Sequence, residues 1–460
     1  MRGFLASSVG VTCAAALVLP LALSAPAQAA TRAAKTDPAV PGSTRSLPLV
    51  PLGDDRALGA AAPEQGLTRR AVRSFSLVGV IWDDPDTELR GRVQVRTRAS
   101  GTTHWTGWQD IETHNHEHGA DPDTAESGSG RVRGSTAPLW VGDSDGVEVR
   151  VQAEVDERST SPGESPLPRG MHLELVDPDA EAPSGEASTA GGRATGANAG
   201  KEPATTAEAA AAAAVATHEA TAANAELAPL GATEIPALSK ARTEREYLAA
   251  HQGRPGAQPY IGARPRIVTR RGWGANEALR ERGLVYTEKV KAAFVHHTAS
   301  GNNYRCSQAS SVIRSIYRYH VVSSGWRDIG YNFLVDKCGT IYEGRAGGVG
   351  KPVMGAHTLG FNSDTMGIAV LGSFAATRPA AAALSAIARL AAWKLGLYGV
   401  NPRGKTYLKS GGGNLYRKGK NVRLDVISGH RDGFATECPG RLLYGKLGSA
   451  RTTAARYQGR

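Results

Sequence analysis

Three side chains in the C-terminal half of the sequence have the chemistry of a zinc site. The segment Phe-Val-His-His-Thr at residues 294–298 reads as the end of a buried strand and carries His296 and His297. Neighbouring strand residues point to opposite faces, so only one of these histidines can bind a given metal ion from this strand. His430, in Ser-Gly-His-Arg-Asp, and Cys438, in Thr-Glu-Cys-Pro-Gly, are the other two candidate ligands.

Three protein ligands would leave the fourth position of a tetrahedral zinc ion open. That is the arrangement of a catalytic zinc, whose open position takes water and makes it acidic near neutral pH, while a structural zinc takes four protein ligands. The alternative is that the three residues are unrelated and that Cys438 is a buried thiol. Spacing alone leaves both interpretations open.

The first residues predict that the protein is secreted. Arg2 precedes an apolar stretch at residues 9–23, and Ala-Gln-Ala at 27–29 has the small-x-small pattern of a signal-peptide cleavage site. No other segment approaches the ~20 consecutive apolar residues of a membrane helix. We therefore expect a signal peptide at residues 1–29 and a secreted, extracellular mature protein without a transmembrane segment.

The cysteine count supports a special role for Cys438. Of four cysteines in the chain, Cys13 would leave with the signal peptide, so an odd number would remain in an oxidising compartment. Cys306 and Cys338 could close a loop of about thirty residues as a disulfide. Cys438 then remains, and a metal ligand is the natural candidate for its role.

The charge of the chain is unevenly distributed. The total is 54 Lys and Arg against 43 Asp and Glu, but residues 262–460 alone carry 31 basic and 10 acidic side chains. Such a field favours polyanions, either nucleic acid or the acidic polymers of a cell envelope, and export argues against nucleic acid. The segment 401–423, with seven basic and no acidic residues, either binds anionic wall polymers or is a solvated basic loop.

The candidate ligands lie in a segment, residues 263–460, whose pattern predicts an α/β domain with strands and helices in alternation. From residue 379, apolar residues recur with the period of a helix, and Gly396 ends it. The expected elements are strands at 290–297, 331–336, 340–343 and 365–371 and helices at 307–322 and 379–396.

The N-terminal half predicts a second, smaller domain. Residues 69–178 contain short β-rich runs separated by Gly, Pro and Asp, which indicates an antiparallel β-sandwich. Residues 30–68 read as a flexible lead-in, and the Ala/Gly-rich residues 179–262 read as a disordered linker. The tryptophans of the β-rich domain could line a sugar-binding face, but aromatic residues in so small a domain usually form its core.

Histidines alternate within one stretch of the β-rich domain, at His114, His116 and His118. In a strand these side chains would face the same way and could bind a transition metal. The surrounding Gly, Asp and Ser residues instead favour a solvated loop.

Eight short motifs of the C-terminal domain occur in one characteristic order. They are Arg-Ile-Val at 266–268 with Trp-Gly-Ala at 273–275, Val-His-His-Thr-Ala at 295–299, Gly-Tyr-Asn-Phe at 330–333, Tyr-Glu-Gly-Arg at 342–345, Gly-Ala-His at 355–357, Met-Gly-Ile at 366–368, Gly-His-Arg-Asp at 429–432 and Cys-Pro-Gly at 438–440. Over residues 264–450 this order resembles the peptidoglycan recognition protein and zinc amidase family.

The resemblance implies an N-acetylmuramoyl-L-alanine amidase, which cuts the amide between muramic acid and the stem peptide of peptidoglycan, with a non-catalytic peptidoglycan receptor as the alternative. The family's zinc ligands fall on His296, His430 and Cys438. Tyr331 falls where catalytic members hold the attacking water, and Thr436 where they carry a polar group over the reaction centre. Non-catalytic members typically lack the cysteine, which this chain has.

The resemblance also assigns substrate contacts. His357 falls near the sugar or lactyl group, and Arg345 is available to the carboxylates of the stem peptide. His297 is expected to pack rather than to bind metal. Where many members have a residue pair that selects the third stem residue, this chain has Ala-Gly-Gly at 346–348, so the diamino acid preference does not transfer.

Overall fold

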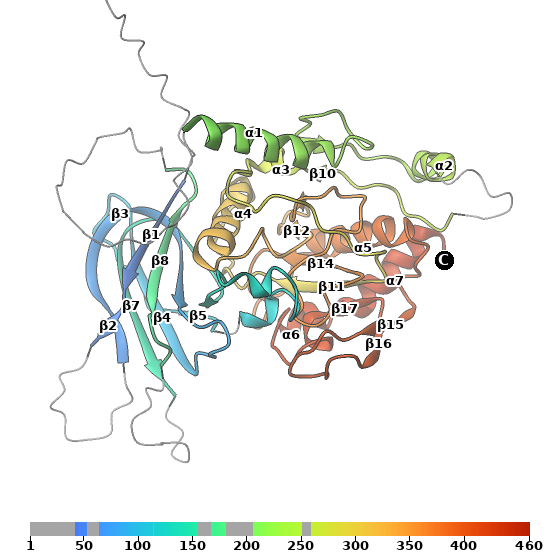
Figure 1. Ribbon diagram of the computed structural model, residues 1–460. Coiled ribbons are helices and arrows are strands. Elements are labelled where there is room, and N and C mark those ends of the chain that lie inside the picture. The colour runs from blue at the N-terminus through green and yellow to red at the C-terminus, as the bar shows by residue number, and fades with distance from the viewer. Residues whose placement is uncertain (1–41, 53–63, 114, 155–166, 181–205, 251–258) are drawn as a thin grey trace, which may run out of the picture. The chain divides into compact units, whose positions relative to one another are not determined.

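The computed structural model describes residues 42–52, 64–113, 115–154, 167–180, 206–250 and 259–460 (Figure 1). The predicted signal peptide at residues 1–29 lies outside these ranges. None of the helices within them combines the length and the apolar character of a membrane span.

An antiparallel sheet forms the β-rich domain that the sequence predicts. Its main strands are ordered β1-β8-β3-β7-β4-β5, while β2 and β6 pair with β3. Val147, Val149 and Val151 of β7 alternate with polar residues and are fully buried in the domain core. The strands are β1 (Ser43–Pro48), β2 (Val50–Pro51), β3 (Glu64–Trp82), β4 (Gly91–Ala99), β5 (Gln109–Ile111), β6 (Gly134–Ser135), β7 (Leu139–Ala153) and β8 (His172–Asp177).

The second half of β3 is buried on both faces. Val78 and Val80 belong to the core of the β-rich domain, whereas Leu77 and Ile81 belong to an apolar cluster shared with helix α4 (Ala309–Arg318) of the C-terminal domain. Successive strand residues point to opposite faces, so one strand serves two cores. The sheet therefore packs against the C-terminal domain through its second face.

The prediction of a flexible lead-in at residues 30–68 is wrong for its described part. Strand β1 pairs antiparallel with β8, from Ser43 opposite Asp177 to Pro48 opposite His172. The partner strand lies more than a hundred residues away in sequence and supplies the hydrogen bonds that hold this polar segment. A local pattern carries no signal for such a distant partner.

The disordered linker predicted at residues 179–262 also contains folded elements. They are α1 (Thr206–Ala222), β9 (Glu234–Ile235) and α2 (Lys240–Ala250). Ile235 is fully buried, and Arg280 donates to the Ala216 carbonyl and to the Glu219 carboxylate of α1 at 2.9 and 2.7 Å. Small alanine side chains let the α1 backbone approach its neighbour closely, so the helix docks without large apolar residues.

The C-terminal domain is built on a mixed seven-stranded sheet of order β17-β11-β14-β12-β13-β10-β9, which confirms the α/β prediction. The three pairs from β17 to β12 are parallel, as is the pair of β13 with β10, while β12 with β13 and β10 with β9 are antiparallel. The remaining elements of the domain are β10 (Ile267–Val268), α3 (Arg270–Trp273), β11 (Ala292–His297), β12 (Phe333–Val335), β13 (Ile341–Glu343), β14 (Thr365–Val370), α5 (Ala381–Gly396), β15 (Lys405–Lys409), β16 (Asn421–Asp425), β17 (Ile427–Gly429), α6 (Arg441–Tyr444) and α7 (Leu447–Gln458).

Helices cover both faces of this sheet (Figure 1). Ile387 and Leu395 of α5 pack with Val295 of β11 in one core. Ile313 and Ile316 of α4 pack in the cluster on the other face. The strand and helix positions agree with the periodicity of the sequence.

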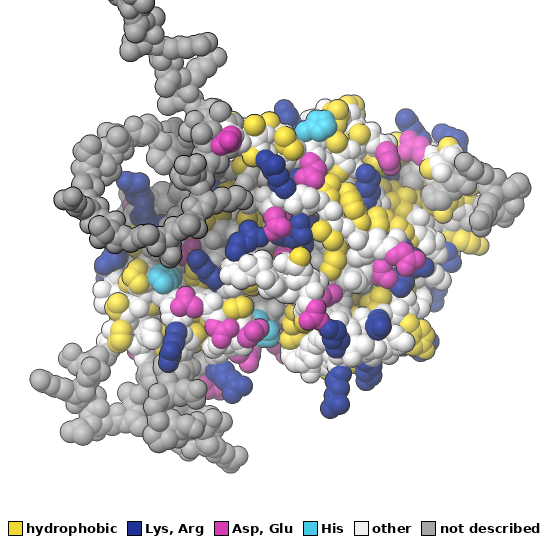
Figure 2. All heavy atoms as spheres, in the orientation of Figure 1, with side chains coloured by type: hydrophobic (Ala, Val, Ile, Leu, Met, Phe, Trp, Pro, Cys, Tyr) yellow, Lys and Arg dark blue, Asp and Glu magenta, His cyan; other side chains and the backbone are white. Residues whose placement is uncertain are grey.

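In the view of Figure 2, Lys and Arg side chains are scattered over the described surface and acidic side chains lie among them. The basic segment 401–423 forms the β15–β16 hairpin, in which Lys405 pairs with Asp425 at 2.6 Å.

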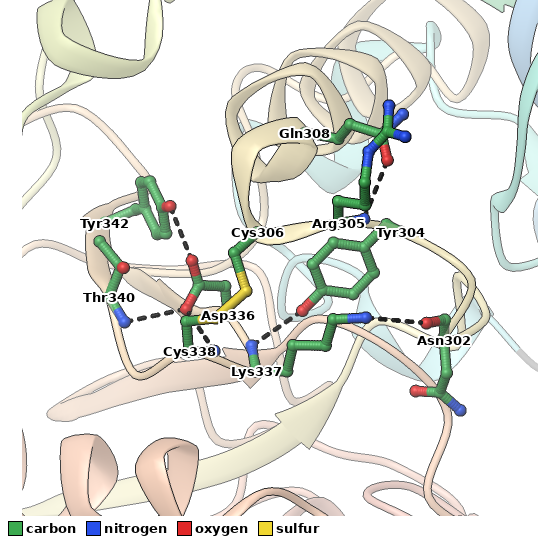
Figure 3. The surroundings of a disulfide bond; sticks show 10 residues. All are labelled: Asn302, Tyr304, Arg305, Cys306, Gln308, Asp336, Lys337, Cys338, Thr340 and Tyr342. Carbon is green, nitrogen blue, oxygen red and sulfur yellow. Dashed lines mark hydrogen bonds between the residues drawn. A yellow bond between two sulfur atoms is a disulfide. The ribbon is translucent and has the colours of Figure 1, made fainter.

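A disulfide joins Cys306, just before α4, to Cys338 in the β12–β13 turn, with 6.2 Å between the two Cα atoms (Figure 3). The same turn is held by the Asp336 carboxylate, which accepts hydrogen bonds from the backbone N–H of Cys338 and Thr340 and from the Tyr342 hydroxyl. The pairing expected from the sequence is the one present.

We expect the Cys306→Ala/Cys338→Ala double variant to lose about 3–4 kcal/mol of unfolding free energy, the entropic contribution of closing a loop of this length. Denaturant titration measures the loss, and non-reducing peptide mapping of the wild-type protein should recover the linked pair. A Cys438 peptide linked to either partner would contradict the pairing.

Candidate metal centre

Two parallel strands bring the first two candidate ligands together. His296 lies near the end of β11, and His430 begins the short helix η5 (His430–Asp432) directly after β17. Val295 pairs with Gly429, and the residue that follows each of them is a histidine, so the two ring centroids are 4.6 Å apart. The sheet register thus sets the spacing of the pair.

Cys438 completes the set from the loop before α6. Its Sγ lies 3.8 Å from His296 Nδ1. The loop is held by its own backbone, since the Arg431 N–H donates to the Cys438 carbonyl at 3.1 Å. All three candidate ligands are fully buried.

A fourth candidate ligand comes from the β-rich domain. The ligand atoms of His118, His296, His430 and Cys438 lie within 4.8 Å of one another. His118 ends the short helix η1 (His116–His118) and stacks edge-on against His430, with 4.5 Å between ring centroids. The expectation of a solvated loop is therefore wrong for His118, which is 5% exposed. His114 lies outside the described residues.

The chemistry of these residues fits a zinc ion. Both ring nitrogens of His118 are buried without a hydrogen-bond partner among the described residues, which is unfavourable unless an ion is bound there. Burial, with help from neighbouring histidines, holds the pKa of His296 and of His430 well below the usual range, so both rings are neutral and offer a lone pair. Nitrogen and thiol donors in one buried cluster are typical of zinc.

His357 lies behind His296. Its Nδ1 is 3.3 Å from His296 Nε2 and 3.0 Å from the Thr358 hydroxyl. Burial lowers the pKa of His357 to about 3. A Cβ at position 367 of β14 would lie 2.5 Å from the His357 ring, so only glycine fits there. With Nε2 facing His357, the Nδ1 of His296 is the nitrogen that faces Cys438.

Tyr331 and Thr436 flank the cluster. The Tyr331 ring, just before β12, lies 5.6 Å from His296 and 5.8 Å from His118 between centroids. Burial and the nearby Cys438 raise the pKa of Tyr331 well above its usual range. The Thr436 hydroxyl accepts from the Cys438 N–H at 3.1 Å and donates to Glu117 at 2.9 Å.

The other predicted site residues are placed as follows. Arg345 is buried in an ion pair with Glu126 of the β-rich domain, 2.8 Å from its carboxylate. The carboxylate outweighs the effect of burial and raises the pKa of the guanidinium. His297 lies outside the cluster, 3.6 Å from Glu112. Sequence reasoning missed Glu117 and Glu126, because acidic residues in a polar loop carry no local sign of a partner domain.

Two family models match the chain. Residues 26–184 match a family described as Rv3811 N-terminal galactose-binding domain-like, and residues 286–441 match the N-acetylmuramoyl-L-alanine amidase family.

Several characterised proteins are similar to the C-terminal part. Peptidoglycan-recognition protein SC2 of Drosophila melanogaster is 31% identical over 193 residues, which are 42% of this chain and 88% of the relative. A human N-acetylmuramoyl-L-alanine amidase is 32% identical over 206 residues, 44% of this chain and 31% of the relative. Among solved structures, Drosophila PGRP-LB is 25% identical, with a TM-score of 0.32, over 40% of this chain and 93% of its own.

We expect the purified protein to contain one zinc ion per chain, measured by plasma mass spectrometry. Cys438→Ser should lower metal affinity at least about tenfold, because a soft thiolate is replaced by a hard hydroxyl. His104→Ala, which changes an exposed histidine of the β-rich domain, should bind metal normally. A zinc-free wild-type protein, or unchanged affinity in Cys438→Ser, would refute this ligand set.

Proposed function

Because the chain belongs to the family of peptidoglycan-recognition proteins and N-acetylmuramoyl-L-alanine amidases, we propose that it is a secreted, zinc-dependent amidase of the cell wall. Its substrate is peptidoglycan, and the bond cut is the amide between N-acetylmuramic acid and the L-alanine of the stem peptide. The observation that carries the proposal is the buried cluster of His296, His430 and Cys438 with Tyr331 beside it. The resemblance described above associates the cysteine and the tyrosine with catalytic members.

Each residue of the site has a role in this reaction. His296, His430 and Cys438 would hold the zinc ion, which would supply Lewis acidity for amide hydrolysis when bound. The Tyr331 hydroxyl positions the attacking water and relays its proton. The Thr436 hydroxyl, fixed by the Cys438 backbone, donates to the developing oxyanion.

His357 acts as a positioning residue. Its Nδ1 faces His296 Nε2 at 3.3 Å, which orients the ring and leaves the opposite nitrogen for the metal. Arg345, in turn, is the cation suited to a stem-peptide carboxylate, since a guanidinium binds carboxylates through two hydrogen bonds. The basic β15–β16 hairpin provides a surface for anionic wall polymers.

One observation favours a second function, peptidoglycan binding without cleavage. His118 brings the cluster to four protein donors, and four protein ligands are typical of a structural zinc site. A receptor would tolerate such a closed site, whereas an enzyme must open it.

The two functions differ in what they release from peptidoglycan. We expect the mature protein, or its His118→Ala variant if the closed site limits the rate, to release new N-terminal alanine amines from purified peptidoglycan. A chelator should abolish the release, because the Lewis acid is lost. Binding that persists with chelator, with no amine release by either protein, would instead establish the receptor.

Tyr331→Phe tests the proposed acid–base group. The ring keeps its volume, so the variant should remain folded and bind zinc, since such swaps usually cost less than about 1.5 kcal/mol. Its rate should fall about 10²-fold, the scale of losing one positioned acid–base group. The rate is compared with that of the parent protein that carries Tyr331, which is the wild type or His118→Ala, whichever is active. Unchanged turnover would make Tyr331 structural.

A further inference from the structure

The loop between β5 and β6 covers the metal centre. We refer to its described residues 115–133, which include η1 and η2 (Ser127–Ser129), as the plug. The plug carries four acidic residues, Glu117, Asp121, Asp123 and Glu126, and each of them contacts the basic C-terminal domain.

At the centre of the plug, His118 takes the place of a fourth ligand. Its ring lies 4.5 Å from His430 and 5.4 Å from His296 between centroids. Catalytic zinc keeps its fourth position for water or substrate, while four protein ligands close the site. His118 therefore occupies the position that the proposed reaction requires.

Beside His118, Glu117 accepts a hydrogen bond from Thr436, whose hydroxyl was assigned to the oxyanion. Its buried carboxylate accepts the Thr436 hydroxyl at 2.9 Å. Its backbone carbonyl accepts the Leu359 N–H at 2.9 Å, which fixes η1 over the site. Thr436 cannot donate the same proton to a substrate while this bond is formed.

Further along the plug, Glu126 forms an ion pair with Arg345, the residue assigned to the stem-peptide carboxylate. Its two carboxylate oxygens accept Arg345 Nη1 and Nη2 at 2.8 and 2.9 Å. The two side chains are 8% and 6% exposed. The plug thus presents a carboxylate to Arg345 in the way that a substrate carboxylate would.

Asp121 anchors the plug next to the metal centre. Its carboxylate accepts the Gly360 N–H at 2.8 Å and the Asn362 side-chain amide at 2.7 Å. The side-chain oxygen Oδ1 of Asn362 accepts hydrogen bonds from the backbone N–H of His357 and Thr358 at 2.7 and 3.0 Å. The anchor is therefore continuous with the residues that orient His296.

From these contacts we propose that the plug is a built-in inhibitor, in which His118 is the fourth metal ligand while Glu117 and Glu126 occupy the substrate-binding groups. This inference rests on the proposed amidase site. The protein is then latent until the plug is displaced, and a substrate must compete with a ligand that is tethered to the site.

The coordination of the metal can be tested without measuring activity. In the full-length mature protein, zinc is replaced by cobalt, and azide is then added while the visible spectrum is recorded. An anion enters the coordination sphere most readily at an open position, so the spectrum of His118→Ala should respond to azide far more strongly than that of the wild type. His104→Ala is the control and should behave as the wild type. An equal response in the wild type would overturn the assignment of His118.

The blocking of substrate groups is tested with a second, independent variant. Binding of a soluble N-acetylmuramoyl tripeptide is measured by calorimetry for the wild type, His118→Ala and Glu126→Ala, all checked for intact fold by circular dichroism. Without competition from the plug, a larger fraction of the protein is in the binding-competent state, so binding should tighten at least about tenfold. Affinities equal to the wild type in both variants would overturn the plug.

Failure of the plug and failure of the amidase proposal give different results. In one outcome, the wild type releases amines as fast as both variants, and neither the azide response nor the substrate affinity differs between them. This result rejects the plug and keeps the amidase. An azide response and tighter binding in the variants, with no amine release by any protein, keeps the plug as the gate of a receptor and rejects the amidase.

Discussion

The parallel register of β11 and β17 is the constraint on which the site depends. Pairing Val295 with Gly429 makes His296 and His430 neighbours at the carboxyl ends of adjacent strands. A shift of one residue would turn His296 to the opposite face, because side chains alternate along a strand. The Gly429 position enforces the close packing here, since a Cβ would lie 2.6 Å from the Tyr444 ring. Cys438 and Tyr331 then need only loops that reach this edge.

A second apolar core decides where the plug lies. Tyr319, in the π-helical turn η4 (Tyr319–Ser323), places its hydroxyl 3.1 Å from the Thr136 carbonyl beside β6, and its ring packs with Leu77 and Trp140. This core fixes β6, and the plug runs directly into β6. The shared apolar core therefore sets the arrangement of the two domains, and the acidic side chains of the plug contact their partners within that arrangement.

The sequence predicts the site better than it predicts what covers the site. His296, His430 and Cys438 have distinctive types and lie in motifs with a local pattern, so strand periodicity and the family resemblance identify them. His118 stands more than 170 residues before His296 in a polar loop, and its environment arises from tertiary contacts alone. The same limit applies to strand β1, whose partner is distant, and to the alanine helix α1, which packs through its backbone. One signal was present: the apolar run at residues 75–82 is nearly uninterrupted, which is typical of a strand buried on both faces.

The shared core also determines whether the two domains can be separated. Ile313, Ile316 and Tyr319 of the C-terminal domain are fully buried against a cluster that includes Leu77, Ile81 and Val176 of the β-rich domain. A protein shortened to the C-terminal domain would present these side chains to water as a contiguous apolar patch, and such patches promote self-association. Loss of the β-rich domain would therefore change the solubility of the remainder as well as its access to substrate. The N-terminal sheet is therefore a structural part of the C-terminal domain, because the two share one buried apolar cluster.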